Sequence, residues 1–124
     1  MTFEKQDLEV RLIDFGIQII KLAEAMPRTP AGRHLSEQIL RSGTSPALNY
    51  AEAKAGASHR DFTNKIKTVL KELRETWVNL RITEGSGIHP GKDTVAAALK
   101  ESSELVAIFT ESVRTAEKRS PPRN

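Results

Sequence analysis

The sequence predicts an all-α protein that folds as an antiparallel, up-down-up-down four-helix bundle. Four segments repeat apolar residues at helical spacing over about 20–25 residues each. Stretches that contain Pro or Gly separate these segments at residues 27–30, 56–57 and 84–92. Because the connections are short, consecutive helices should run antiparallel. We expect residues 1–118 to form the bundle domain and residues 119–124 to form a disordered tail.

The first helix is expected from about Lys5 to Ala25, and it is apolar on two sides. One side should face the core: Leu8, Leu12, Phe15, Ile19, Leu22 and Met26. The other side points nearly the opposite way, and we call it the outer α1 stripe: Val10, Ile13, Ile17 and Ile20. A surface helix of a monomer normally carries one apolar stripe. We therefore expect another subunit to cover the second one, although a helix central to its own bundle is the alternative.

The second helix is expected from about Ala31 to Ala55, since Pro27 and Pro30 cannot lie in a helix interior. Its inward seam is unusually small and polar: Leu35, Ile39, Ser42, Pro46, Asn49 and Ala53. Small side chains would allow a neighbouring helix to approach closely. A buried Asn49 amide would need a specific hydrogen-bond partner.

Polar residues beside that seam predict an ion pair. Arg41 and Glu52 lie along one line of the second helix, and Glu72 borders the core face of the third. We expect Arg41 to pair with Glu72 or Glu52 at a helix–helix or subunit seam, with a solvated arginine as the alternative. Arg41, Asn49, Glu52 and Glu72 are thus interpreted as a structural polar seam.

The third helix combines an apolar face with a line of cations. Ser58 to Asp61 resembles a capping box at its start. The core face is expected to contain Phe62, Ile66, Val69, Leu70, Leu73, Trp77 and Leu80. The opposite face carries a set that we call the basic stripe: Arg60, Lys67, Lys71, Arg74 and Arg81.

The fourth helix should begin near Asp93, after a loop from Glu84 to Lys92. Its core positions are expected to be Val95, Leu99, Ser102, Val106, Phe109 and Val113.

Positive charge is concentrated in the middle of the chain. Of the net charge of +3, the excess comes from residues 27–83, which hold ten Lys or Arg and five Asp or Glu. Such a bias can bind phosphate backbones, and a merely solvated surface is the alternative. No uncharged apolar stretch approaches the ~18 residues of a membrane span, and no apolar run with a cleavage site follows the charged start. We expect a cytoplasmic protein that does not contact membranes.

No catalytic or metal-binding signature is legible. Gly91 and Lys92 lack the upstream glycine and the following Ser or Thr of a phosphate-binding loop. The chain has no cysteine, and none of its three histidines follows a Glu by three residues, as di-metal bundles require. We expect no enzymatic activity, no metal and no cofactor.

Three motifs resemble a known family. They are Gln38–Ser45, Asn49–Ala53 and the run from Asp61 to Trp77. They resemble the bacterial "four helix bundle protein" family, which includes the protein encoded in intervening sequences of large-subunit ribosomal RNA genes. The accessory variability protein of diversity-generating retroelements is a more distant relative. The resemblance covers about residues 8–83, and residues 45–48 depart from the smaller residues usual in the family.

The resemblance implies a bundle that assembles as a ring-like homopentamer, and it supplies no catalytic residues. Studied relatives are associated with nucleic acid and with partner proteins. We therefore expect a non-enzymatic homo-oligomer whose basic stripe binds the RNA or DNA backbone. Because Trp77 is expected on the core face, base stacking is not expected. The alternative is a protein-interaction scaffold or accessory subunit that docks an acidic protein partner without binding nucleic acid directly.

Overall fold

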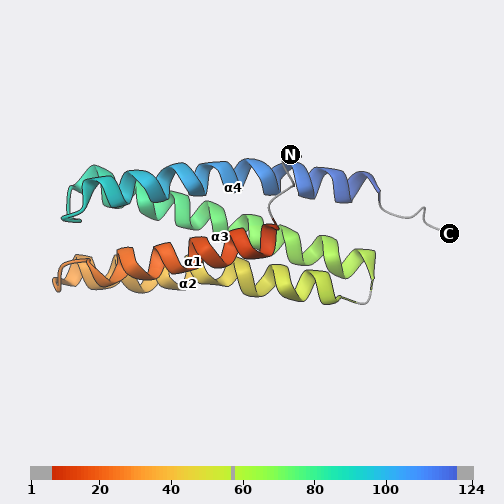
Figure 1. Cartoon of the computed structure of the whole chain (residues 1–124), viewed down its shortest axis with the longest axis horizontal. Coiled ribbons are helices and arrows are strands. Elements are labelled where there is room, and N and C mark those ends of the chain that lie inside the picture. The colour runs from red at the N-terminus through yellow and green to blue at the C-terminus, as the bar shows by residue number, and fades with distance from the viewer. Residues whose placement is uncertain (1–6, 57, 120–124) are drawn as a thin grey trace, which may run out of the picture.

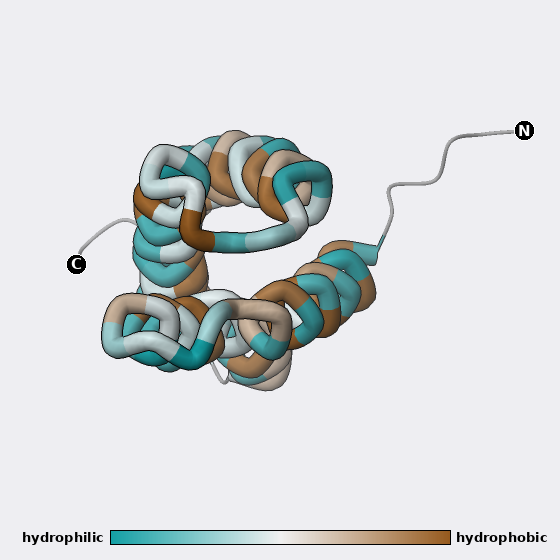
Figure 2. Tube along the Cα trace, turned by 90° about the vertical axis from the view of Figure 1, so that its left-hand side faces the viewer, coloured by the Kyte–Doolittle hydropathy of each residue, from teal (hydrophilic) through white to brown (hydrophobic). Residues whose placement is uncertain are grey.

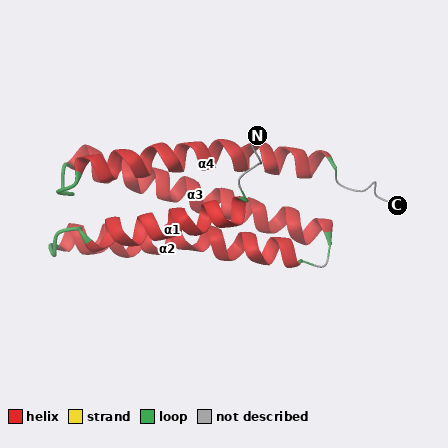
Figure 3. Cartoon of the chain, viewed as in Figure 1, coloured by secondary structure: helices red, strands yellow, loops and turns green. Residues whose placement is uncertain are grey.

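The computed structural model describes residues 7–56 and 58–119, and this part of the chain contains four α-helices and no strand (Figure 3). The helices are α1 (Leu8–Glu24), α2 (Pro30–Ala55), α3 (His59–Ser86) and α4 (Lys92–Lys118). Consecutive helices run antiparallel, and each packs against its neighbours in a four-helix bundle (Figure 1). The predicted fold class is confirmed.

Side-chain caps set the beginnings of the first three helices. Asp7, Thr29 and Ser58 each accept a hydrogen bond from a backbone N–H in the first turn, at 2.9–3.1 Å. Pro30 follows Thr29 at the first helical position, where its missing N–H costs no helical hydrogen bond. The predicted beginnings of the second and third helices are therefore correct to about one residue, whereas the start of the first helix at Lys5 falls outside the described residues.

The expected loop at residues 84–92 is too long, because α3 continues through Ser86. Gly87 ends the helix with a left-handed backbone (φ 66°), a conformation that costs glycine little. The connection is thus residues 87–91. The predicted tail, apart from Arg119, lies outside the described residues.

The core forms where the apolar faces of the four helices meet. Its largest fully buried side chains include Phe15, Phe109, Leu12, Ile19, Leu22, Ile39, Ile66, Leu73, Leu80 and Leu105. The predicted core stripe of α1 is confirmed from Leu12 to Met26, and Leu8 is partly buried at its end.

Two glycines, Gly16 and Gly43, lie in the contact between α1 and α2. A Cβ atom on Gly43 would lie 2.7 Å from Cγ2 of Ile19, so the isoleucine fills the place of that missing side chain. Gly16 faces the same contact, with the Gly43 carbonyl oxygen 3.7 Å from its ideal Cβ position. Close approach of a neighbouring helix was expected at the small residues of the α2 seam, and the glycine that makes this contact, Gly43, is the residue after Ser42 of that seam.

A ladder of buried polar groups joins α2 to α3. The hydroxyls of Ser42 and Thr76 lie 2.9 Å apart, and the Asn79 amide donates to the Leu35 carbonyl at 3.2 Å. Thr83 donates to the Asn79 side-chain oxygen at 3.2 Å. The sequence analysis placed Ser42 inside but missed the three polar partners on α3. These bonds fix the rotation of α3 about its axis, because any other rotation would leave buried polar groups unpaired.

The α1–α4 edge is the least extensive of the four helix contacts. Arg11 bridges it with ion pairs of 2.8 Å to both Glu101 and Glu104.

At the end of the bundle, the buried His89 accepts a hydrogen bond from the Gly91 N–H at 2.8 Å through its Nδ1 atom. Its Nε2 therefore carries the proton and donates to the Leu22 carbonyl at 2.9 Å, which ties the last connection to α1.

Replacing Gly43 with alanine should lower the free energy of unfolding by up to about 2 kcal/mol. Overpacking against Ile19 costs about 1–3 kcal/mol, and the roughly 1 kcal/mol that alanine gains over glycine in a helix offsets only part of that cost. Gly16→Ala is the matched control: its Cβ would meet only ordinary contacts, so it should stabilise by about 0.5–1 kcal/mol. Urea unfolding of the two variants measures the difference, and equal stability of the two would contradict the close contact.

Candidate functional site

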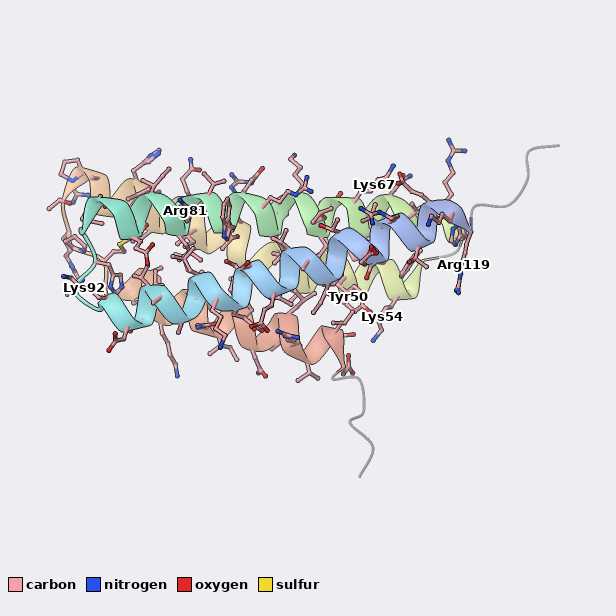
Figure 4. All side chains as sticks on the ribbon, turned by 90° about the horizontal axis from the view of Figure 1, so that it is seen from above. Tyr50, Lys54, Lys67, Arg81, Lys92 and Arg119 are labelled. Carbon is pink, nitrogen blue, oxygen red and sulfur yellow. The ribbon has the colours of Figure 1, made fainter. Side chains whose placement is uncertain are left out.

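The basic stripe lies along the outward face of α3. Arg60, Lys67, Lys71, Arg74 and Arg81 are all exposed. They span 21 residue steps of one helix, or about 30 Å. Figure 4 labels Lys67 and Arg81, which lie along the same side of the bundle.

Two of these cations already have partners in the single chain. Lys67 lies 2.8 Å from the Glu117 carboxylate on α4, in a pair whose two side chains are about half exposed. Arg81 lies over the Trp77 ring, 5.0 Å from its centroid. Among the described residues, Arg60, Lys71 and Arg74 form no ion pair. The stripe therefore presents cations that the folded chain leaves largely uncompensated.

Apolar side chains interrupt the stripe toward the end of α3. Val78 and Ile82 are 49% and 53% exposed, and the sequence analysis assigned them no role. They border a groove of about 650 Å³ between α2 and α3, whose wall also includes Leu35, Leu70 and Arg41. A helical wheel could have found them, since both lie at angles close to those of the basic stripe.

Trp77 differs from its predicted place in the core. Its side chain is partly exposed at the edge of α3 and lines a surface pocket of about 310 Å³ between α3 and α4. The other walls are Arg74, Val78, Ser103 and Val106. The position lies at the border of the apolar arc, and the small Ser103 on α4 leaves space beside it.

The predicted pair between Arg41 and Glu52 or Glu72 does not form within the chain. Arg41 is exposed and has no ion pair with another described residue. Glu52 instead accepts from Lys65 across the α2–α3 seam. Asn49 has a partner, but it is the Ser45 carbonyl of its own helix at 3.2 Å and not a group on another helix.

Among the described residues, Glu72 is the carboxylate whose charged form is disfavoured by burial. Its Oε2 is buried and has no hydrogen-bond partner among the described residues. Burial raises the pKa of the Glu72 carboxyl above its ordinary value, and the negative charge of Glu75 adds to the rise. The positive charges of Arg41 and Lys71 oppose it. Arg41 is thus close enough to act on Glu72 electrostatically without pairing with it.

The outer α1 stripe points away from the core, as its spacing predicted. Val10, Ile13, Ile17 and Ile20 are 40–47% exposed. Figure 2 looks along the bundle and shows that hydrophobic residues recur along α1, the first helix of the chain. No other part of the described chain fully covers them, so they face either solvent or a group outside the described residues.

The described residues contain neither a cluster of metal-binding side chains nor a helix that could span a membrane. No group of three or more His, Cys, Asp or Glu residues among them could hold a metal ion. Within residues 7–56 and 58–119, no helix has the length and apolar character of a membrane span.

Comparison with known proteins identifies a family and related solved structures. The family model described as 23S rRNA-intervening sequence protein matches residues 5–111. A crystal structure of a protein of unknown function from the S23 ribosomal protein family of Bacteroides thetaiotaomicron has a TM-score of 0.78 and 26% identity. That match covers 86% of this chain and 98% of the other. No curated protein matches the chain.

Replacing Glu72 with glutamine should raise the melting temperature near pH 7 by about 1–4 °C, because the variant removes a charge that burial disfavours. Because the folded-state pKa is raised above the unfolded-state value, the loss of stability from the charged carboxylate begins above the ordinary Glu pKa and is complete above the folded-state pKa. The gain should therefore disappear as the pH falls to about 4, near the ordinary Glu value.

Thermal unfolding across pH measures this gain, and Glu37→Gln, at an exposed position on α2, is the control. A loss of stability in Glu72→Gln at pH 7 would instead mean that the carboxylate is paired.

Proposed function

The chain belongs to the 23S rRNA-intervening sequence protein family, and from that premise we propose a non-enzymatic, cytoplasmic homo-oligomer that binds the phosphate backbone of RNA or DNA. The observation that carries the proposal is the basic stripe on α3. The family name refers to 23S rRNA intervening sequences and names no ligand, so the proposal covers both RNA and DNA.

Electrostatics supports this use of the stripe. Like charges three or four residues apart on a helix destabilise it by a few tenths of a kcal/mol per pair, so Lys67, Lys71 and Arg74 together carry a small cost in the unbound protein. A phosphate backbone would relieve that repulsion. The Lys67–Glu117 pair is exposed and worth less than about 1 kcal/mol, so a phosphate can replace the carboxylate.

Oligomerisation would strengthen a weak single-chain affinity. The outer α1 stripe and the basic stripe lie on different helices, so subunits can associate through α1 while α3 stays available. Copies of one basic stripe in a closed assembly then bind one long polyanion at high effective concentration. The pentamer is the form that the family resemblance implies.

A second candidate rests on Val78 and Ile82. The lining of their groove includes the apolar Leu35 and Leu70 as well as the cations Lys71 and Arg74. An acidic amphipathic helix of a partner protein would match both features. Pulldown from lysate with and without nuclease separates the candidates, since only capture through nucleic acid is lost after digestion.

Changing Lys67, Lys71 and Arg74 together to Glu should weaken RNA and DNA binding by at least about tenfold at about 50 mM salt. Loss of three phosphate contacts should also reduce the magnitude of the salt slope by about 2–3. Fluorescence anisotropy with a labelled oligonucleotide measures both quantities.

A charge-matched control tests position against net charge. Lys92, Lys100 and Lys118 are exposed on α4, and their change to Glu alters the net charge by the same amount. This variant should bind more tightly than the stripe variant. Equal losses in the two would show that the stripe has no special role.

Changing Ile13 and Ile17 to Glu should dissociate the oligomer to monomers, because each new carboxylate would be buried without a partner in the interface. The helices should remain, since both positions are exposed in the single chain. Sedimentation velocity measures the mass and circular dichroism the fold. Ala96→Glu with Ala107→Glu, at exposed positions on α4, is the control. An unchanged mass in the α1 variant would exclude the outer α1 stripe as the interface.

A further inference from the structure

We propose that the Trp77 pocket receives one unstacked base of a single-stranded nucleic acid, while Arg74 and Arg81 bind the phosphates beside it. The inference rests on the proposed function and names the form of ligand that the basic stripe prefers. It also reverses the expectation that base stacking has no place in this protein.

The pocket has the shape and chemistry that a base requires. Its volume of about 310 Å³ is at the lower end of ligand pockets, which suits a small flat group. The indole of Trp77 and the side chains of Val78 and Val106 offer apolar surface to the base. Ser103 adds a hydroxyl that can donate to or accept from a base edge.

Cations lie on both sides of the tryptophan. Arg74 and Arg81 are three residues before and four residues after Trp77, so both are its neighbours on the helix surface. Arg74 contributes to the pocket wall, and Arg81 lies 5.0 Å from the ring centroid. A backbone that follows the basic stripe therefore passes the mouth of the pocket, with a guanidinium for the phosphate on each side.

This arrangement selects single strands over duplexes. In a duplex the bases are paired and stacked, so none can enter a side pocket without being extruded. A base stacked on an aromatic side chain strengthens binding by about fivefold to about a hundredfold. The cations alone would bind both forms.

Trp77 is the only tryptophan in the chain, so its fluorescence reports on this pocket alone. The native protein is titrated with single-stranded oligouridine and, separately, with duplex RNA of equal length, while anisotropy records binding. We expect saturable quenching and a spectral shift with the single strand, and binding of the duplex without either change. Single-strand binding that leaves the fluorescence unchanged, or an equal response to both ligands, would overturn the proposal.

The variant Trp77→Leu should weaken oligouridine binding by about fivefold to about a hundredfold and leave duplex affinity and both salt slopes unchanged. Trp77→Phe, which keeps an aromatic face, should retain most of the affinity. If Trp77→Leu binds oligouridine as the native protein does, the pocket is excluded and the basic stripe stands. If the native protein binds neither ligand, the proposed function fails as well. Should Trp77→Leu unfold, the fluorescence titration of the native protein still decides.

Discussion

The contact between Ile19 and Gly43 is the constraint on which the exposed surfaces of this bundle depend. Because Ile19 occupies the space where a Gly43 side chain would be, α1 can lie against α2 in one rotation only. That rotation buries Phe15 and its neighbours along the core stripe. An apolar helix with one fixed inward face must turn its second apolar face outward, and this is why the outer α1 stripe is available to another copy of the chain.

Buried hydrogen bonds fix the rotation of α3, as the contact between Ile19 and Gly43 fixes that of α1. The bonds between Thr76 and Ser42 and between Asn79 and Leu35 hold one side of α3 against α2. Directional bonds of this kind specify rotation more sharply than apolar packing, because a small turn leaves buried groups unpaired. The basic stripe consequently faces solvent along α3, with the exposed Val78 and Ile82 near its end. The bundle thus presents an apolar face on α1 and a cationic face on α3, and each has its own use in the proposed oligomer.

Apolar periodicity was sufficient to predict the four helices and the bundle, since core burial is what the pattern encodes. It failed where burial and residue type disagree. Thr76 and Asn79 are polar residues typical of a surface, but both are buried and form hydrogen bonds. Trp77 is typical of a core, but it lies at the border of the apolar arc and is partly exposed. The predicted Arg41 pair does not form within the described chain, because a partner on another helix depends on rotation, which the sequence does not reveal; a pair across a subunit seam stays a prediction. Residues 84–86 were predicted as a loop because they include Gly85, but they are helical, and only Gly87 adopts the left-handed backbone that ends α3.

The most direct test of the central claim is a salt series of the native protein with single-stranded RNA and with duplex DNA, followed by fluorescence anisotropy. A multivalent cationic surface predicts micromolar or tighter binding at about 50 mM salt. The affinity should then fall between about 50 and about 200 mM salt with a logarithmic slope of at least about 2–3 in magnitude. Absence of binding at low salt, or binding that does not depend on salt, would contradict the claim. In that event the groove beside Val78 and Ile82, and hence an acidic protein partner, would become the leading interpretation.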